Sequence, residues 1–402
     1  MTHRFQRIRR FRFNLPQRIA AGLLGVFLLQ GLWLIARQAL SERDYQYARC
    51  GREMWEQPLQ LSGSFTSCGN IPDGVLAYRL AGLPLTLNLL AERALDRFRS
   101  PGDRVVQTEG ELSSWELRHQ LRYTPLLLRL PFLAAGCLLG GCLWWVTRRL
   151  YGNLGGYTAL AFYCFSPPVL RACVAPTPEV LAALGVFGGV YTCIGVAHAM
   201  QGPRRKWRPR IFLLTAIFAV AAASHIASLL VVILAGLALM LWVAEGRRSQ
   251  VLPLVLIAAA GAFVLLFACY GFSPQAFSAF FQSHAALLGL SFDPAKRFFS
   301  TLSNTGITLA TSAALALYIA QRRSRYFGNT APLLCAAVLF LLVTKGAPGA
   351  SWLWALTFLF TFVGGVFADA YESKRGRLAL GAAAAIVLLQ AVLCVVSLPG
   401  LL

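Results

Sequence analysis

Long apolar runs separated by short basic segments dominate this sequence and constrain its fold more than any other feature. Each run has the length that an α-helix needs to cross the ~30 Å hydrocarbon core of a bilayer. The chain is 57% hydrophobic and only 13% charged, whereas soluble domains carry about 25% charged residues. The alternating ten-residue segments typical of a transmembrane barrel are missing. The sequence therefore predicts an all-α polytopic membrane protein.

The apolar runs predict about 11 transmembrane helices, within a range of about 10 to 13. The expected helices cover residues 19–40, 125–147, 154–170, 177–200, a pair within 211–242, and then 251–272, 305–320, 330–344, 351–368 and 378–396. The run at 211–242 would be ~48 Å long as one helix, at ~1.5 Å per residue. Because both of its flanks are basic, we expect two short helices that turn at Ser224 and His225.

Basic residues concentrate in the segments between alternate spans. Those segments together hold 21 lysines and arginines against three acids, whereas residues 41–124 hold ten arginines and eleven acids. The positive-inside rule places the basic segments, and with them the N-terminus, in the cytoplasm. The net charge of +21 then reflects topology and does not indicate nucleic-acid binding. The first apolar run is too long for a cleaved signal peptide, so we expect a retained helix.

The predicted organisation has four parts. A cytoplasmic basic N-terminus (1–18) and a first transmembrane helix (19–40) precede an extracytoplasmic loop (41–124), and a transmembrane helical domain (125–402) with a second outer loop (273–304) follows. Apolar spacing over residues 75–95 predicts an amphipathic helix at the membrane interface. An oxidising compartment would allow a disulfide between Cys50 and Cys68 of the first loop, worth ~3 kcal/mol.

Two acids directly follow the first span. A carboxylate at the membrane surface can act as general base on an acceptor while a lipid-linked donor lies in the bilayer, which makes Glu42 and Asp44 candidates. The same residues are also what the polar end of any helix leaving a membrane contains. The sequence leaves both interpretations open.

Further charged residues lie at the predicted outer ends of other spans. Arg129 is one turn into the second span, where a charge faces a cavity, pairs with another charge or snorkels to the interface. Arg171 can pair with Glu179 or bind a phosphate, and His225 and Lys345 lie at the ends of later spans. Charged residues gathered on one side of the membrane are what a membrane-embedded site needs. The ends of helices that form no site would carry the same residues on that side. Zinc, nucleotide-loop and serine-hydrolase motifs are missing from the sequence.

Several stretches are similar to a known family. They are LRLPFLAAGCLLGGCLWWVTRRLYG at residues 128–152, AFYCFSPPVL at 161–170, PTPEVLAAL at 176–184 and GNIPDGVLAYRLAGLPL at 69–85. From about residue 18 to 370 the layout resembles the GT-C superfamily of glycosyltransferases that use polyprenyl-phosphate sugars, including the protein O-mannosyltransferase and aminoarabinose transferase types. The resemblance implies a large outer loop whose first residues hold the catalytic acid.

This chain resembles a divergent member, because several motif positions differ. Arg43-Asp44 stands where many relatives have Asp-Glu, Asp73-Gly74-Val75 where they have His-Pro-Pro, Pro178-Glu179 where they have Thr-Asp, and Ser224-His225 where they have Ser-Lys. An acid remains at the first of these positions, so the resemblance still implies chemistry there.

The resemblance implies transfer of a sugar from a polyprenyl-phosphate donor to an acceptor at the outer face of the bacterial cytoplasmic (inner) membrane. Asp44 and Glu42 are the expected catalytic acids. The expected substrate-binding residues are Asp73, Arg79, Arg129, Arg171, Glu179, His225 and Lys345. No cofactor is required and no metal-binding residue is named, and dependence on a divalent metal stays open. The expected partners are the bilayer, the lipid-linked sugar and an acceptor, with no nucleic acid.

Two alternatives stay open at this point. The first is a catalytically inactive GT-C-like membrane protein that binds lipid or serves as a subunit beside a membrane-protein partner. The second is a secondary transporter, which is disfavoured because the two related halves with broken helices are not found in the sequence.

Overall fold

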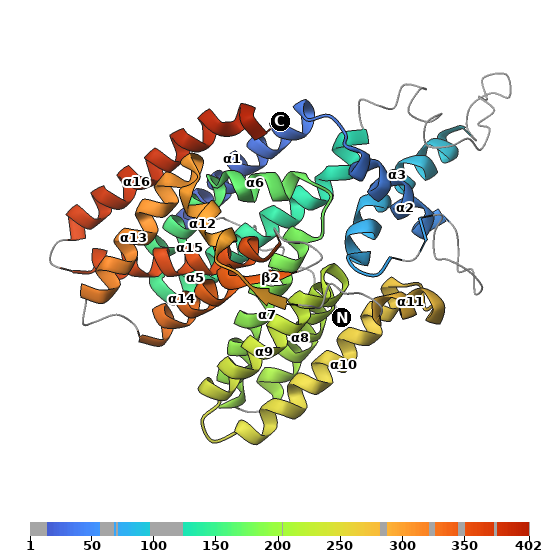
Figure 1. Cartoon of the computed structure of the whole chain (residues 1–402). Helices are drawn as coiled ribbons and strands as arrows, with labels where there is room; N and C mark the ends of the chain where they lie inside the picture. The colour runs from blue at the N-terminus through green and yellow to red at the C-terminus, as the bar shows by residue number, and fades with distance from the viewer. Residues whose placement is uncertain are drawn as a thin grey trace, which may run out of the picture.

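The computed structural model describes residues 14–56, 68–69, 71–96, 124–202, 204–281, 288–320, 326–344, 350–373 and 376–401. These residues form a bundle of helices with one short pair of strands (Figure 1). Within the described ranges eight helices are long and apolar enough to cross a membrane. They are α1 (Leu15–Arg37), α5 (Thr124–Cys164), α7 (Glu179–Met200), α9 (Ile226–Val243), α10 (Val251–Cys269), α13 (Thr305–Ala320), α15 (Ala350–Tyr371) and α16 (Gly376–Ser397). The prediction of an all-α polytopic membrane protein is confirmed.

Helix α5 contains two of the predicted spans in one run. Its 41 residues correspond to ~60 Å at ~1.5 Å per residue, about twice the thickness of a bilayer core. Gly152 interrupts the run with φ 83°, a left-handed conformation that glycine adopts without strain. The chain bends at Gly152, a few residues beyond Arg148 and Arg149, where the sequence predicted the span at 125–147 to end. Helix α6 (Pro167–Val174) follows, with proline at its first turn.

The apolar run at 211–242 forms two helices, as predicted. Helix α8 (Arg204–Ser224) ends where α9 begins, and His225 between them has an extended backbone with φ −161°. The His225 ring accepts a hydrogen bond from the Ala227 N–H at 3.3 Å, which caps α9. Helices α8 and α14 (Tyr326–Leu341) carry shorter apolar segments than the eight helices above.

Helices α2 (Glu42–Glu56) and α3 (Val75–Asp96) of the first loop pack side by side (Figure 1). The helix predicted over 75–95 is therefore observed. Cys50 of α2 forms a disulfide with Cys68, the pairing that the sequence allowed. The two helices cross at Gly82, where an added Cβ would collide with the backbone of α2.

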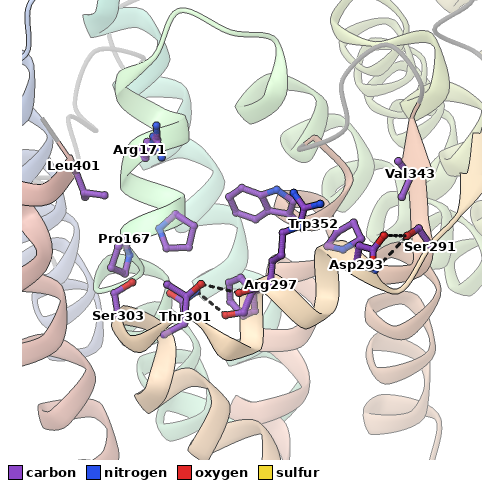
Figure 2. Close-up of a pocket in the computed structure, with 14 residues that line it drawn as sticks. Pro167, Arg171, Ser291, Asp293, Arg297, Thr301, Ser303, Val343, Trp352 and Leu401 are labelled. Carbon is purple, nitrogen blue, oxygen red and sulfur yellow. Dashed lines mark hydrogen bonds between the residues drawn. The ribbon is translucent and has the colours of Figure 1, made fainter.

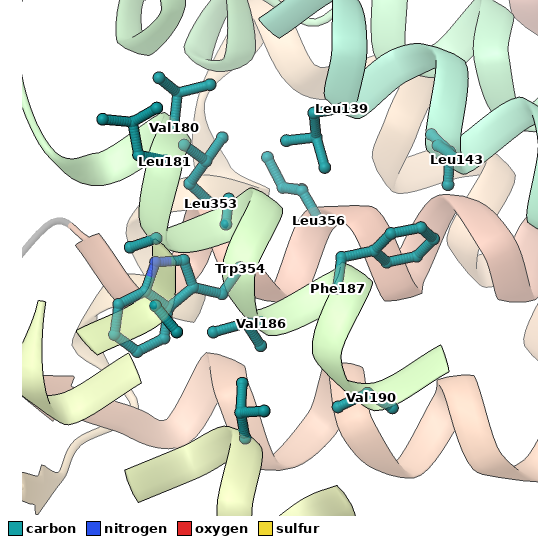
Figure 3. Packing of buried hydrophobic residues seen from close by; sticks show 14 of the residues in the cluster. Leu139, Leu143, Val180, Leu181, Val186, Phe187, Val190, Leu353, Trp354 and Leu356 are labelled. Carbon is teal, nitrogen blue, oxygen red and sulfur yellow. The ribbon is translucent and has the colours of Figure 1, made fainter. Parts of the chain in front are cut away.

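Helix α15 lies at the centre of the bundle, and its apolar stretch is almost wholly buried. It packs against α5, α7, α13 and α14. Figure 3 shows this packing, with Leu139 of α5 beside Leu356 of α15. Phe187 of α7 packs against Phe358 of α15, with ring centroids 5.3 Å apart. Helix α16 is mostly exposed, as suits a helix facing lipid, because apolar side chains in a bilayer need no burial against protein.

The second predicted outer loop contains structure that the sequence did not indicate. Helices α11 (Pro274–Phe281) and α12 (Asp293–Ser300) lie in it, together with a 3₁₀ turn at Leu302–Asn304. Strand β1 (Leu288–Leu290) pairs antiparallel with β2 (Leu342–Thr344), which directly follows α14. Strands of three residues are too short for a recognisable alternation of side chains, so no pattern could have predicted them.

Contacts of the first loop bring the ends of several spans together at one end of the bundle, here called the loop end. Helix α2 contacts the start of α5, and α3 and the segment before it contact the start of α7, the turn between α8 and α9, and the end of α10. The predicted grouping of helix ends on one face is therefore present.

Candidate functional site

Asp44 and Arg129 form a buried ion pair at the loop end. Asp44 Oδ2 lies 2.5 Å from Arg129 Nη2, and the exposed fractions of the two residues are 6% and 2%. The guanidinium also donates to the carbonyls of Gln38 and Ala39, both at 2.9 Å. Asp44 Oδ2 accepts a further hydrogen bond from the Ser41 N–H at 2.9 Å. The pair thus joins the segment after α1 to the first turn of α2 and to α5.

This arrangement assigns Asp44 and Arg129 a shared structural role. A buried charge is costly unless it is paired and hydrogen-bonded, and each of these residues neutralises the charge of the other. Among the described residues, Arg129 Nε alone of the guanidinium nitrogens has no hydrogen-bond partner. Within the described part of the chain, the hydrogen bonds of the Asp44 carboxylate go to Oδ2. Oδ1 is therefore the oxygen that remains to accept a proton. Glu42 lies two residues before Asp44, is exposed and takes no part in the pair.

A second polar cluster lies beside this pair and links α2, α3, α6 and α7. The rings of Tyr47 and Tyr78 stack with centroids 4.2 Å apart, and the positive charge of Arg43 lies near the Tyr47 hydroxyl. Burial raises the pKa of Tyr47, and the nearby positive charge of Arg43 opposes the rise. Glu179, at the first turn of α7, interacts electrostatically with both Arg43 and Arg171.

Sequence reasoning found Glu179 and Arg171 but missed Arg43, Tyr47 and Tyr78. The available signal was helical spacing, because residues 43 and 47 lie one turn apart on α2 and therefore share a face. Tyr78 on α3 is distant from Tyr47 in the sequence, so helical spacing could not indicate their contact.

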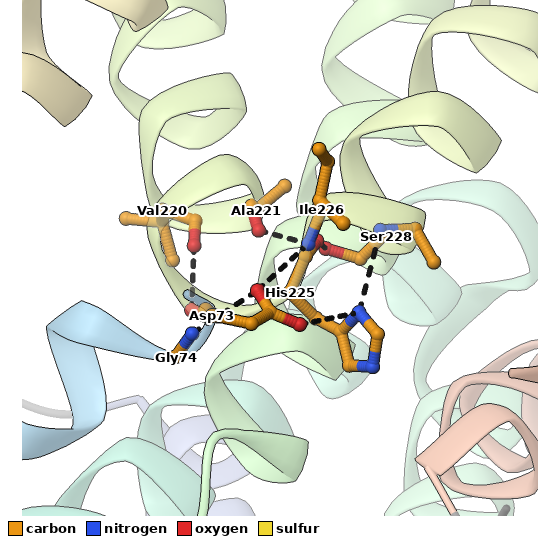
Figure 4. Close-up of polar contacts among 9 residues, drawn as sticks. Asp73, Gly74, Val220, Ala221, His225, Ile226 and Ser228 are labelled. Carbon is orange, nitrogen blue, oxygen red and sulfur yellow. Dashed lines mark hydrogen bonds and ion pairs between the residues drawn. The ribbon is translucent and has the colours of Figure 1, made fainter. Parts of the chain in front are cut away.

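Asp73 and His225 form a third polar contact (Figure 4). Asp73 Oδ2 lies 3.2 Å from His225 Nδ1, and Oδ1 accepts from the N–H groups of Ile226 at 3.1 Å and Gly74 at 3.0 Å. Burial raises the pKa of Asp73 to about 7, partly offset by these two backbone hydrogen bonds. Burial lowers the pKa of His225 to about 4. Burial therefore disfavours the charged form of both side chains.

Gly74 brings this contact close to Glu179. Its φ of 76° is left-handed, and a Cβ there would lie 3.4 Å from the Pro178 side chain and 3.7 Å from the Ser224 carbonyl. The glycine therefore allows the first loop to meet the start of α7 and the turn after α8 together. The Trp354 ring of α15 lies edge-on to His225, with centroids 5.8 Å apart.

Arg79 was expected to bind substrate, and the structure places it between elements of the protein. Its Nε donates to the Cys269 carbonyl at 2.5 Å, and its Nη1 donates to the Met54 carbonyl at 3.2 Å. The guanidinium lies 5.0 Å from the Trp55 ring centroid, within the range of a cation–π contact. These contacts tie α2 and α3 to the end of α10. Lys345 lies outside the described residues.

A cavity of about 520 Å³ opens among α6, α12, β2 and the start of α15 (Figure 2). Among the predicted site residues, Arg171 lines it. Arg297, Asp293, Asn304 and Trp352 also line it, and the sequence did not single these residues out. The cavity has the size of small-ligand sites, which occupy ~300–1,000 Å³. Arg171 thus belongs both to this cavity and to the cluster around Glu179.

Within the described residues, no group of three or more His, Cys, Asp and Glu side chains is arranged to hold a metal ion. The loop end carries three acids (Asp44, Asp73 and Glu179), with arginines beside two of them. Carboxylates can remove a proton from an attacking hydroxyl or amine, and guanidinium groups can stabilise an anionic leaving group.

The sequence matches no protein-family profile, and no curated protein matches it significantly. Two solved structures of an oligosaccharyltransferase from Archaeoglobus fulgidus are similar in fold. One, a complex with zinc and sulfate, has a TM-score of 0.54 at 13% identity and covers 92% of this chain and 52% of that chain. The other, tethered to an acceptor peptide, has a TM-score of 0.53 at 12% identity and covers 93% and 54%.

This chain spans about half the length of the archaeal protein that it matches. The match extends over nearly the whole of the described helical bundle, at an identity that carries fold information alone. The chain therefore has the GT-C type of membrane fold.

Proposed function

We propose that the protein transfers a sugar from a polyprenyl-phosphate donor to an acceptor at the outer face of the bacterial cytoplasmic membrane. The observation that carries this proposal is the gathering of acids and arginines at the loop end of a GT-C fold. Glu179 interacts there with Arg43 and Arg171, beside the buried pair of Asp44 and Arg129. The charge pattern of the loops supports a cytoplasmic N-terminus and an outer position for this end.

In the proposed reaction the acceptor oxygen or nitrogen attacks the anomeric carbon of the donor sugar. Its bond to that carbon forms as the carbon–oxygen bond to the phosphate breaks, and polyprenyl phosphate leaves with the electron pair. Asp44 takes the acceptor proton on Oδ1, while Arg129 holds Oδ2 and so fixes the carboxylate. Arg171 stabilises the negative charge of the leaving phosphate. The family resemblance implies inversion at the sugar carbon.

Glu179 and Asp73 have supporting roles in this proposal. Glu179 orients Arg171 towards the phosphate, because it interacts with that guanidinium. Asp73 and His225 hold the first loop against the turn between α8 and α9 and so keep the acids in place.

The test is sugar transfer by the purified protein in proteoliposomes, with synthetic polyprenyl-phosphate sugars as donors and an envelope extract as the acceptor source. Asp44→Asn keeps the shape of the side chain and removes the base, so we expect a loss of ~100-fold or more, within the ~10²–10⁴-fold range of general-base catalysis. Arg171→Gln is expected to lower the rate as well. Glu53→Gln is the matched control on α2, because Glu53 pairs with Arg49 at the surface at 3.6 Å.

A second candidate is a catalytically inactive lipid-binding or complex subunit on the same fold. The buried pair favours this candidate, since Asp44 and Arg129 neutralise each other. Their other hydrogen bonds go to the backbone just after α1 and just before α2. Full transfer activity in Asp44→Asn, or the absence of transfer by wild-type protein that co-purifies with a stoichiometric membrane partner, would favour this candidate over the enzyme.

A further inference from the structure

The cavity between α6, α12, β2 and α15 has a composition that points to a particular kind of ligand. Arg171 enters it from α6, and Arg297 enters it from α12 on another wall. In Figure 2 the Arg297 side chain rises from α12 towards Trp352. Within the described part of the chain, the Arg297 guanidinium has no hydrogen-bonding or ion-pair partner. A planar guanidinium in this setting suits a carboxylate or a phosphate, which it can bind through two hydrogen bonds.

Asp293, the acid in the same cavity, leaves the positive charge of Arg297 available to a ligand. Asp293 starts α12 and accepts a hydrogen bond from the Ser291 hydroxyl at 3.2 Å. Two arginines against one aspartate leave the lining positive, and the aspartate can accept a hydrogen bond from a ligand hydroxyl. The cavity therefore offers an anion site and hydrogen-bond acceptors together.

Asn304 provides a second acceptor at the cavity wall. Its exposed fraction is 3%, its Nδ2 donates to the Phe298 carbonyl at 3.0 Å, and its Oδ1 has no partner among the described residues. A buried acceptor without a partner is unfavourable, so the site gains when a ligand donates an O–H or N–H to it. The ligand should therefore carry hydroxyl or amino groups as well as an anion.

The remaining walls are apolar and partly flat. Trp352 and Phe298 lie with ring centroids 6.3 Å apart, and Pro167 and Pro168 complete this side. A ring with one face of C–H groups can pack against an indole while its hydroxyls reach polar groups at the edge. Among ligands with an anion and several hydroxyls, a pyranose has this shape.

We propose that this cavity binds an acidic sugar, meaning a saccharide unit that carries a carboxylate or a phosphate. The anionic group binds Arg297, the hydroxyls donate to Asn304 and Asp293, and the ring packs on Trp352. The proposal rests on the glycosyl transfer proposed above and specifies that one of the two substrates contains an acidic saccharide. Arg171 then connects the sugar cavity with the acids around Glu179.

The test is ligand-observed NMR of the full chain in phosphatidylcholine nanodiscs. Glucuronic acid and glucose 6-phosphate probe the two acidic classes, glucose is the neutral control, and inorganic phosphate probes the anion alone. We expect one or both acidic sugars to bind at least tenfold more tightly than glucose, and inorganic phosphate to compete poorly. The pattern of the two acidic probes distinguishes a carboxylate sugar from a phosphate sugar.

Two variants of α12 sharpen the result. Arg297→Gln should weaken acidic-sugar binding by tenfold or more, whereas Lys296→Gln, the exposed neighbour outside the cavity, should leave it unchanged. Equal binding of glucose, unchanged affinity in Arg297→Gln, or displacement by inorganic phosphate or by phosphatidic acid in the nanodisc would overturn the proposal. Wild-type protein that transfers sugar but binds neither acidic probe would refute this site and leave glycosyl transfer standing.

Discussion

Removing one member of the buried ion pair should destabilise the protein far more than removing both. In Asp44→Leu the Arg129 guanidinium, which is 2% exposed in the wild type, loses its counter-ion, and such a loss typically costs ~3–5 kcal/mol. The carbonyls of Gln38 and Ala39, both at 2.9 Å, remain and stabilise the cation. We therefore expect the free energy of unfolding to fall by ~3 kcal/mol, the lower end of that range. In Asp44→Leu with Arg129→Met both charges are gone, and replacement of a buried pair by apolar residues is often neutral.

The assay is a double-mutant cycle on the free energy of unfolding, measured by tryptophan fluorescence in mixed micelles of rising SDS fraction. We expect a coupling energy of ~2 kcal/mol or more between Asp44 and Arg129. The i,i+4 pair of Arg49 and Glu53 on α2, whose side chains are 60% and 17% exposed, is the control, with an expected coupling of ~0.3–0.5 kcal/mol. A coupling for the buried pair no larger than that of the control would contradict the structural role assigned to it.

The remaining predictions concern the first loop. The pKa of Asp73 is raised from 3.8 to about 7, so this carboxyl stabilises the fold at low pH, and the stabilisation is lost as the pH rises through about 7. The pKa of His225 is lowered from 6.5 to about 4, so this ring stabilises the fold above pH 6.5, and the stabilisation is lost as the pH falls towards 4. The two effects oppose each other, so wild-type melting temperature should change little between pH 4.5 and 6.5, whereas Asp73→Asn should fall steadily in that interval as the pH drops. Cys50→Ser should lower the melting temperature, and reductant should lower it for wild type but not for the variant, since the disulfide to Cys68 contributes ~3 kcal/mol. Gly82→Ala should separate α2 from α3, detected as faster proteolysis of α3 than in wild type.

The bundle could be predicted because its signals are local. Apolar length and flanking basic residues are properties of single segments, and the turn at His225 followed from segment length and charge alone. The bend at Gly152 was harder to place. A left-handed glycine lets one helix run continue into the next, so the arginine pair that looked like an end lies inside α5.

The candidate site could be predicted only residue by residue. Asp44 and Arg129 were both singled out, but their pairing joins positions 85 residues apart, and no local pattern records such a contact. The same holds for Asp73 and His225, which are 152 positions apart along the chain. Sequence reasoning therefore named Asp44 as a catalytic acid and the other three as substrate-binding residues, whereas the structure pairs these side chains with one another.

The cavity shows the opposite limitation. Arg297 lies in a loop rich in phenylalanine, on a helix of eight residues, where a basic residue beside Lys296 carries no signal of function. Only the fold places Arg297 in the same cavity as Arg171 and the buried Oδ1 of Asn304. Its relevance depends on tertiary arrangement and not on periodicity or motif.

Native mass spectrometry of the purified protein tests the central claim most directly. Wild-type protein should retain a polyprenyl-phosphate species after purification, and a bound polyprenyl-phosphate sugar should lose the mass of its sugar when acceptor is added. In Asp44→Asn the donor should bind and keep its sugar. Binding of bulk phospholipid alone, or a donor mass that stays unchanged in wild-type protein after acceptor is added, would contradict the account.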